Sequence, residues 1–288
     1  MQEAQDIIRR LNKTGRKLSK GHQRIADYIA RHYDKAVFMT AVSLGDMVGV
    51  SESTVVRFAS ALGYEGYPQL QRALQELVRH HLTAEQRFEM TAEIDPAHVL
   101  STVLSTDMRN IRNTIEQVNA DSFHVVVDTI LSAKTIYLVG MRAAAPLAQF
   151  FGYYLNFIFS DVRIVAGGSA DVYESISRIT ESDVLVGISF PRYSTRTLEA
   201  MDYARKQGAK VIGITDGPMS PLHSAAQVSL SARTDMTSFV DSLAAPLSLI
   251  NALVVALALH RKDELNQHLK QLEEIWDQYS VYIDKENQ

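Results

Sequence analysis

The second half of the chain alternates short β-branched runs with helical stretches, and this pattern restricts the fold more than any other feature. Strands are predicted at residues 135–139, 162–165, 183–189, 210–215 and 227–231. Helices are predicted near residues 144–159, 170–180, 195–207 and 240–260. Such alternation indicates βαβ units with a parallel sheet. We therefore predict an α/β domain with a five-stranded parallel sheet flanked by helices.

Ligands of such sheets bind at the carboxyl ends of the strands. This rule selects three loops, at residues 140–144, 167–171 and 189–195. The candidate ligand-binding residues in the first and third loops are Gly140, Arg142, Ser189, Arg192, Tyr193, Ser194 and Thr195. In the second loop, Gly167-Gly168-Ser169 can approach a ligand through its backbone or form a plain turn.

The third loop has the chemistry of an anion site. It ends at the N-terminus of a predicted helix, where free N–H groups and the helix dipole attract phosphate. Arg192 and Arg196 add guanidinium groups, which can hold two phosphate oxygens at once. The alternative is that Ser194 or Thr195 caps the helix while both arginines are solvated. Arg142 could likewise reach a phosphate or form a surface salt bridge.

The first 80 residues predict only short helices. Ile7, Ile8 and Leu11 mark one apolar face, and Ile25 and Ile29 mark a second helix that Ser19 can cap. This segment has 12 Lys and Arg against 8 Asp and Glu, whereas residues 81–288 have 17 against 25. A basic segment beside an acidic remainder fits a module that faces nucleic acid.

Residues 43–63 predict two short helices joined by a tight turn at Gly49. The inner face of the first helix is predicted from Leu44, Met47 and Val48. The buried stripe of the second, which Gly63 terminates, is predicted from Val55, Phe58, Ala59 and Leu62. Val50 can fill the corner between the helices. The hydroxyl of Ser51 is predicted to cap the second helix.

The opposite face of the second helix predicts DNA recognition. Small hydroxyls and one arginine gather at its N-terminal half, the part that a recognition helix places against bases in the major groove. The candidate DNA-binding residues are Ser43, Ser51, Glu52, Ser53, Thr54 and Arg57. The alternative is a helical hairpin with solvated serines.

The stretch VSESTVVRFASALGYEGYPQLQ resembles the helix-turn-helix of the RpiR family of bacterial regulators, over about residues 3–80. In that family the second domain is a sugar-isomerase (SIS) domain, and the βαβ pattern is similar to it over about residues 122–261. SIS domains hold a sugar phosphate with a loop of the form S-x-S-G-x-T. In ISFPRYSTRT, Ser189 and Ser194 match its ends, whereas Pro191 and Arg192 replace its middle serine and glycine.

The resemblance implies four segments. Residues 1–80 form the helix-turn-helix domain, 81–121 a linker and connecting helix, 122–261 the SIS domain, and 262–288 a C-terminal helix. Residues 81–97 are polar and are interpreted as linker. The connecting helix, residues 98–119, has apolar residues predicted to share one face, namely Val99, Val103, Met108, Ile111, Ile115 and Val118.

These features predict a transcriptional regulator of carbohydrate metabolism that binds duplex operator DNA and a phosphorylated sugar, as a dimer or tetramer. The alternative is a sugar-phosphate isomerase with an accessory helical domain. Its candidate bases are Glu174, His223 and Asp241, the last expected to begin the final helix, and they form no spaced pair. No cofactor, metal or membrane is predicted. The chain has no cysteine, which favours the reducing cytoplasm.

Overall fold

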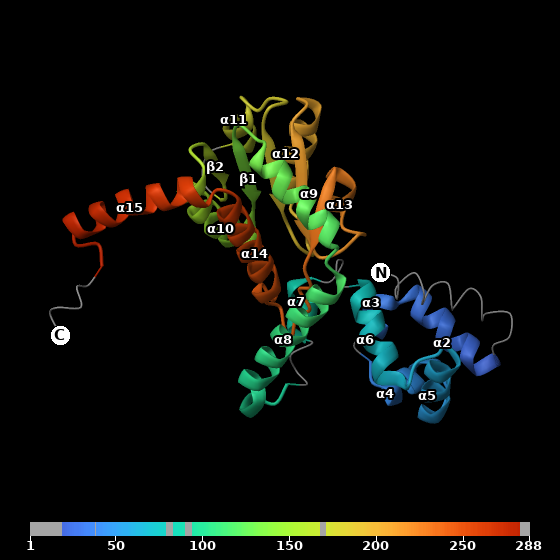
Figure 1. The fold of residues 1–288 in the computed structure, drawn as a ribbon. Coiled ribbons are helices and arrows are strands. Elements are labelled where there is room, and N and C mark those ends of the chain that lie inside the picture. Colours follow the sequence, from blue (N-terminus) through green and yellow to red (C-terminus); the bar gives the residue numbers. More distant parts are fainter. Residues whose placement is uncertain (1–18, 38, 79–82, 90–93, 168–170, 283–288) are drawn as a thin grey trace. The chain divides into compact units, whose positions relative to one another are not determined.

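The computed structural model describes residues 19–37, 39–78, 83–89, 94–167 and 171–282 (Figure 1). Two compact units result, one of residues 1–102 with 237–240, the other of residues 103–236 with 241–288. The helix predicted around Ile7, and Gly168 and Ser169 of the second predicted loop, lie outside the described residues.

The first unit consists of short helices, and the first five of them, between Ile25 and Leu74, surround one core. The helices are α2 (Lys20–Arg31), α3 (Tyr33–Ala36), α4 (Ala41–Val48), α5 (Glu52–Ala61), α6 (Tyr67–Val78), α7 (Ala84–Glu89) and the 3-10 turn η2 (Pro96–His98). Ser19 caps α2 as predicted, because its hydroxyl accepts from the N–H of His22. The segment interpreted as linker contains α7, so it is not extended throughout.

The helix-turn-helix forms where it was predicted. Gly49 ends α4 with φ of 71°, and Gly63 follows α5 with φ of 87°, conformations that a side chain would strain. The predicted stripe of α5 is buried. Met47 was assigned to the inner face of α4, but its side chain is 57% exposed. Leu44 is buried and Val48 packs half-buried against the core, as predicted, so only Met47 of the three lies on the solvent side of α4.

The second unit contains the predicted parallel sheet. Its strands are β1 (Ile136–Gly140), β2 (Val162–Val165), β3 (Val184–Ile188), β4 (Lys210–Thr215) and β5 (Val228–Ser231). The spatial order is β2-β1-β3-β4-β5, with every pair parallel. β1, β3 and β5 each differ from the predicted limits by one residue at one or both ends.

Helices cover both faces of this sheet (Figure 1). One core packs beneath α9 (Ala120–Leu131), α10 (Ala145–Ile158) and α14 (Ala244–His260). The other packs beneath α11 (Val172–Ile176), α12 (Thr195–Lys206) and α13 (Pro221–Ala225). Side chains alternate along β1, with Ile136 and Leu138 in the first core and Tyr137 and Val139 in the second.

Two helix predictions on this unit were too long. The helix predicted at 170–180 is limited to α11, and the one at 240–260 begins only at Ala244. Asp241 therefore precedes α14 in a loop. The chain then bends by 101° into α15 (Lys262–Gln278). Within the described residues no single helix has the length and apolarity to cross a membrane, although the bent pair α14 and α15 reaches those limits jointly.

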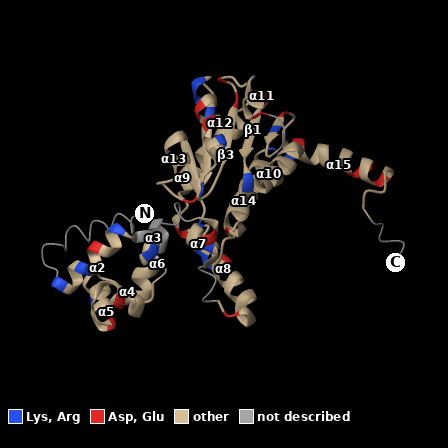
Figure 2. Ribbon diagram, turned by 180° about the vertical axis from the view of Figure 1, so that it is seen from behind, with Lys and Arg blue, Asp and Glu red and all other residues tan. Residues whose placement is uncertain are grey.

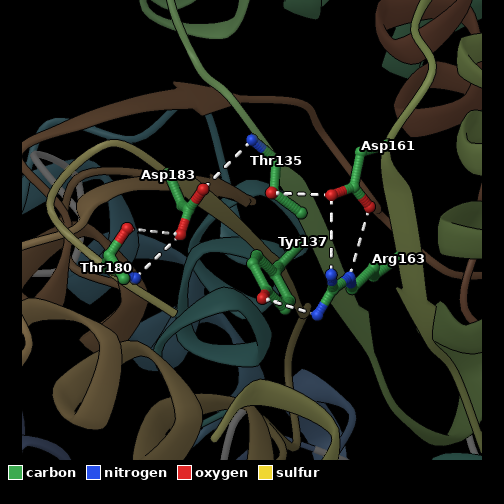
Figure 3. A network of polar contacts seen from close by, with 6 residues as sticks. All are labelled: Thr135, Tyr137, Asp161, Arg163, Thr180 and Asp183. Carbon is green, nitrogen blue, oxygen red and sulfur yellow. Dashed lines mark hydrogen bonds and ion pairs between the residues drawn. The ribbon is translucent and has the colours of Figure 1, made fainter. Parts of the chain in front are cut away.

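The amino ends of β1, β2 and β3 are joined by a polar network (Figure 3). The buried Asp183 accepts from Thr180 N and Oγ1, both at 2.8 Å, and from the N–H of Thr135 at 3.1 Å. The Thr135 hydroxyl donates to Asp161 at 2.9 Å, and Arg163 pairs with that carboxylate. These bonds satisfy charged groups at the amino ends of the strands, whereas the predicted ligand loops follow the carboxyl ends. The network therefore stabilises the sheet and is separate from the candidate ligand site.

The connecting helix α8 (Val99–Gln117) buries polar residues and leaves most of its predicted apolar face exposed. Its buried residues are Thr106, Asn110 and Thr114. Met108 and Ile115, by contrast, are 63% and 74% exposed. The physical reason is that its polar side chains bond to the backbone after β5, which an apolar face could not do.

Candidate DNA interface and ligand site

The candidate DNA-binding residues form one exposed surface at the start of α5. Ser51, Glu52, Ser53 and Arg57 are exposed, while Thr54 is half-buried. Ser43 is exposed in the first turn of α4, where its N–H donates to the hydroxyl of Thr40.

The Ser51 hydroxyl does not cap α5 as predicted. It lies 3.0 Å from the Ser53 hydroxyl and 2.9 Å from the Thr54 hydroxyl, and makes no side-chain cap bond. The first-turn N–H of Thr54 donates instead to the Ser51 carbonyl. Three hydroxyls thus cluster at the helix N-terminus, a combination suited to phosphate oxygens.

Arg57 lies along α5 with its Nε donating to the Ser53 carbonyl at 3.1 Å. The side chain is solvent-exposed, so its two terminal nitrogens are accessible to a ligand on this face. That geometry suits two parallel bonds to a guanine edge, as expected for a recognition-helix arginine.

Basic residues of α2 adjoin this face, which the sequence pattern did not reveal. Gly21 of α2 lies close to Thr54 of α5, since a Cβ on Gly21 would be 3.3 Å from the Thr54 methyl. Arg24 lies close to the turn at Gly49, since a Cβ on that glycine would be 3.9 Å from the Arg24 guanidinium. Lys20 and Arg24 are exposed in the first half of α2, and Figure 2 shows Lys and Arg of α2 in blue. The only signal in the sequence was the net positive charge of the first 80 residues.

The two predicted ligand loops lie side by side. β1 pairs with β2 on one side and β3 on the other, and Gly140 aligns with Ile188. The chain order reverses between β1 and β3, which is the topological switch point where such sheets bind ligands. Residues 140–144 and 189–195 leave the sheet at this point.

The position of Gly140 has no room for a side chain. A Cβ at this position would lie 2.7 Å from the Ala144 carbonyl oxygen and 2.9 Å from the Ala148 methyl. Only glycine lets the 3-10 turn η3 (Arg142–Ala144) and α10 pack against the end of β1. Gly140 therefore lets this loop, part of the candidate ligand site, lie close to the sheet.

Arg142 and Arg192 are both in the left-handed region, with φ of 56° and 63°. Of the described residues other than glycine, only Ser280 shares this conformation. Both arginines are exposed at the switch point, one on each loop. Strained backbone of this kind concentrates at functional sites. Arg192 stands where the family loop has glycine, so the turn is kept although the side chain is added.

The serines of the third loop shape the loop itself. Ser189 Oγ accepts from the N–H of Ser194 at 3.0 Å, which closes the turn. The Ser194 hydroxyl accepts from the N–H of Thr197 and so caps α12, one of the alternatives considered. Each hydroxyl retains its proton as a donor. Thr195 is exposed at the first position of α12.

The predicted candidate Tyr193 contacts Asp216, and Thr197 is buried nearby; neither Asp216 nor Thr197 was predicted from the sequence. The Tyr193 hydroxyl donates to Asp216 after β4 at 2.8 Å, tying the loop to the next strand. Thr197, in the first turn of α12, is fully buried, and its hydroxyl has no hydrogen-bond partner in the described part of the chain. The contact between Tyr193 and Asp216 could not be predicted, because it depends on the order of the strands.

The candidate catalytic bases lie on separate elements. Glu174 is exposed on α11, His223 is on α13 with its ring 2.6 Å from the Ser229 hydroxyl, and Asp241 precedes α14. In the described ranges, no three His, Asp or Glu residues are grouped to hold a metal ion.

Comparison with known proteins agrees with both halves of this description. The helix-turn-helix domain of the rpiR family matches residues 5–80, and the SIS domain matches residues 129–256. Together these matches cover more than two thirds of the chain. The chain belongs to the RpiR family. It is a DNA-binding transcriptional regulator with a SIS domain, which confirms the resemblance inferred from its motifs.

Two relatives match this chain over nearly its whole length, and a third matches its second domain. An HTH-type transcriptional regulator of Caldanaerobacter subterraneus is 22% identical over 277 residues, covering 94% of this chain and 96% of that protein. Vibrio vulnificus NanR, solved with ManNAc-6P, has a TM-score of 0.57 at 21% identity and covers 94% of this chain and 98% of its own. The sugar isomerase domain of an RpiR transcription factor from Sphaerobacter thermophilus has a TM-score of 0.59 at 22% identity, covering 62% and 99%.

Proposed function

We propose that this RpiR-family regulator binds operator DNA through the N-terminal half of α5 and is controlled by a phosphorylated sugar held between the loops after β1 and β3. It acts as a homo-oligomer in the cytoplasm, and its SIS domain binds the sugar without converting it. The segment boundaries at residues 80, 121 and 261 belong to this proposal.

The pair of strained arginines at the switch point is the observation that carries the proposal. Arg142 and Arg192 follow neighbouring strands, and each holds an unfavourable backbone conformation at the carboxyl end of the sheet. A phosphate dianion gains from two guanidinium groups and from the N-terminus of α12, whereas a neutral sugar gains little from either. NanR, a relative of similar fold, was solved with a phosphorylated sugar, which supports the same ligand class.

Control of DNA binding requires that the sugar phosphate bind two states of the protein with unequal affinity. The ligand loop is linked to β4 through Tyr193 and Asp216. The N–H of Ala232, which follows β5, donates in turn to the carbonyl of Thr215 at the end of β4. A ligand that displaces the loop can therefore alter the edge of the sheet as far as the segment after β5.

Isothermal titration of the full chain tests the ligand class. ManNAc-6P and glucose 6-phosphate are compared with their unphosphorylated forms. We expect measurable binding for at least one phosphorylated sugar and none for its unphosphorylated match. Equal binding of both forms would place the anion site elsewhere. In parallel, NMR of the bound sugar phosphate should show no aldose–ketose conversion, and turnover would favour the isomerase.

A further inference from the structure

Helix α8 presents an apolar surface that its own domain leaves open. Leu104, Met108 and Ile115 are 53%, 63% and 74% exposed. The face turned toward the domain is polar instead, and Asn110 on it is completely buried. Large apolar side chains exposed together in this way mark an interaction site.

The polar contacts hold α8 in this orientation. Asn110 makes two hydrogen bonds to the backbone of Asp235, at 2.8 and 3.2 Å. The Thr114 hydroxyl accepts from the N–H of Arg233 at 2.9 Å. A rotation that buried Met108 and Ile115 would break all three bonds and leave buried polar groups unsatisfied. The exposed apolar face is therefore a stable property of the domain.

The spacing along this face is that of a coiled coil. Leu104, Met108, Ile111 and Ile115 follow one another at intervals of four, three and four residues, with Ile111 half-buried and the others exposed. These are the d-a-d-a positions of a heptad repeat, and we call them the α8 seam. Two heptads are short for a coil in water. A groove of about 400 Å³ adjoins the seam and adds apolar surface from Phe123, Leu249 and Ala252.

The geometry points to a second copy of this chain as the occupant, with the two α8 helices paired in parallel through the α8 seam. Asp107 lies at a g position and Arg112 at the e position five residues later, the two sites that face each other across a parallel pair. Asp107 Oδ1 accepts from Ser242 at 2.6 Å, which leaves its other oxygen for the partner's arginine.

Parallel pairing also suits the proposed function, on which this inference rests for the existence of an oligomer. The DNA-binding unit is attached at the N-terminal end of α8. Two parallel helices place both attachment points at the same end, so two recognition helices can reach one palindromic operator. An antiparallel pair would place them at opposite ends.

Disulfide cross-linking tests the seam directly, because the chain has no native cysteine. In a parallel pair each a position faces its own counterpart. Met108→Cys and Ile115→Cys should therefore form covalent dimers under mild oxidant, in more than half of the protein. Met219→Cys is the matched control, since this methionine is also exposed, at 49%, but lies after β4. It should cross-link at least tenfold more slowly.

Light scattering on charge variants separates this inference from the proposed function. Met108→Lys should shift the dimer toward monomer by at least tenfold in dissociation constant, because two ammonium groups would meet at the seam, and Met219→Lys should not. Arg112→Glu should weaken the dimer, and adding Asp107→Lys should restore it.

A dimer that neither cross-links at 108 and 115 nor responds to Met108→Lys overturns the seam but leaves the proposed oligomer intact. A monomer at micromolar concentration overturns both.

Discussion

Asn110 of α8 and Asp235 of the segment after β5 bond to each other in both directions. The Asn110 amide nitrogen donates to the Asp235 carbonyl at 2.8 Å, and its oxygen accepts from the Asp235 N–H at 3.2 Å. The two residues are 125 positions apart in the chain. Through this pair, the helix that leads to the DNA-binding unit is attached to the segment that follows the edge strand of the sensor sheet.

Replacing Asn110 by Ala should lower the free energy of unfolding by about 1–3 kcal/mol, because the Asp235 backbone would lose its partners in a buried site. Urea denaturation at neutral pH measures this change. Glu116→Ala, at an exposed position of the same helix, is the control and should change stability by less than about 0.5 kcal/mol. Equal effects of the two variants would contradict the bracing role of Asn110.

Arg57→Ala should weaken operator binding by about 1–3 kcal/mol if the guanidinium holds a base edge. The duplex is obtained by selection from a random library with the wild-type protein, and affinity is read from fluorescence anisotropy at several salt concentrations. Ser60→Ala, further along the exposed face of α5, is the control. Unchanged operator affinity in Arg57→Ala would remove this residue from the interface.

Arg192 offers a test in which stability and ligand affinity move in opposite directions. Its φ of 63° suits glycine, so Arg192→Gly should raise the free energy of unfolding by about 0.5–1 kcal/mol. The same variant should bind the sugar phosphate more weakly by about 1.5–3 kcal/mol, the range for hydrogen bonds to charged groups. Urea denaturation and isothermal titration measure the two effects.

Arg192→Ala is the matched variant, because it removes the guanidinium but keeps a Cβ in the strained conformation. It should lose the same ligand affinity without the gain in stability. Full preference for the phosphorylated sugar in both variants would show that the anion is bound in another loop.

Asp183 should make the fold sensitive to acid. Burial by itself raises the pKa of this carboxyl, but hydrogen bonds from Thr180 and Thr135 outweigh burial and hold the pKa below its usual value. Because the unfolded pKa is about 3.9, the ionised group stabilises the fold fully above that pH. The stabilisation is lost as the pH falls from there through the folded pKa.

Urea midpoints between about pH 3 and 7 check this. Asp183→Asn should be less stable than the wild type at neutral pH, since its amide cannot accept all the present bonds. It should also lose less stability on acidification. Parallel curves for the two proteins would show that other carboxylates account for the acid sensitivity.

Local patterns identified most elements and both candidate sites. The β-branched runs placed all five strands, since buried parallel strands need apolar side chains on both faces. The α5 stripe of Val55 and Phe58 and the turn at Gly49 were legible because helix period and backbone conformation depend on neighbouring residues. Contacts between distant residues, such as Tyr193 with Asp216, were not legible, because they exist only after the strands are ordered.

The sequence by itself determined the two kinds of domain, the parallel sheet, the recognition helix and the two loops that reach the switch point, because each rests on periodicity or on residue chemistry over short distances. Only the tertiary structure decided which face of α8 is buried. Its apolar spacing predicted which residues share a face, but whether that face or the opposite one packs against the domain depends on the neighbouring segment. Here the neighbour is the exposed backbone after β5, whose N–H and carbonyl groups need polar partners, so Asn110 and Thr114 are buried and the apolar seam faces outward.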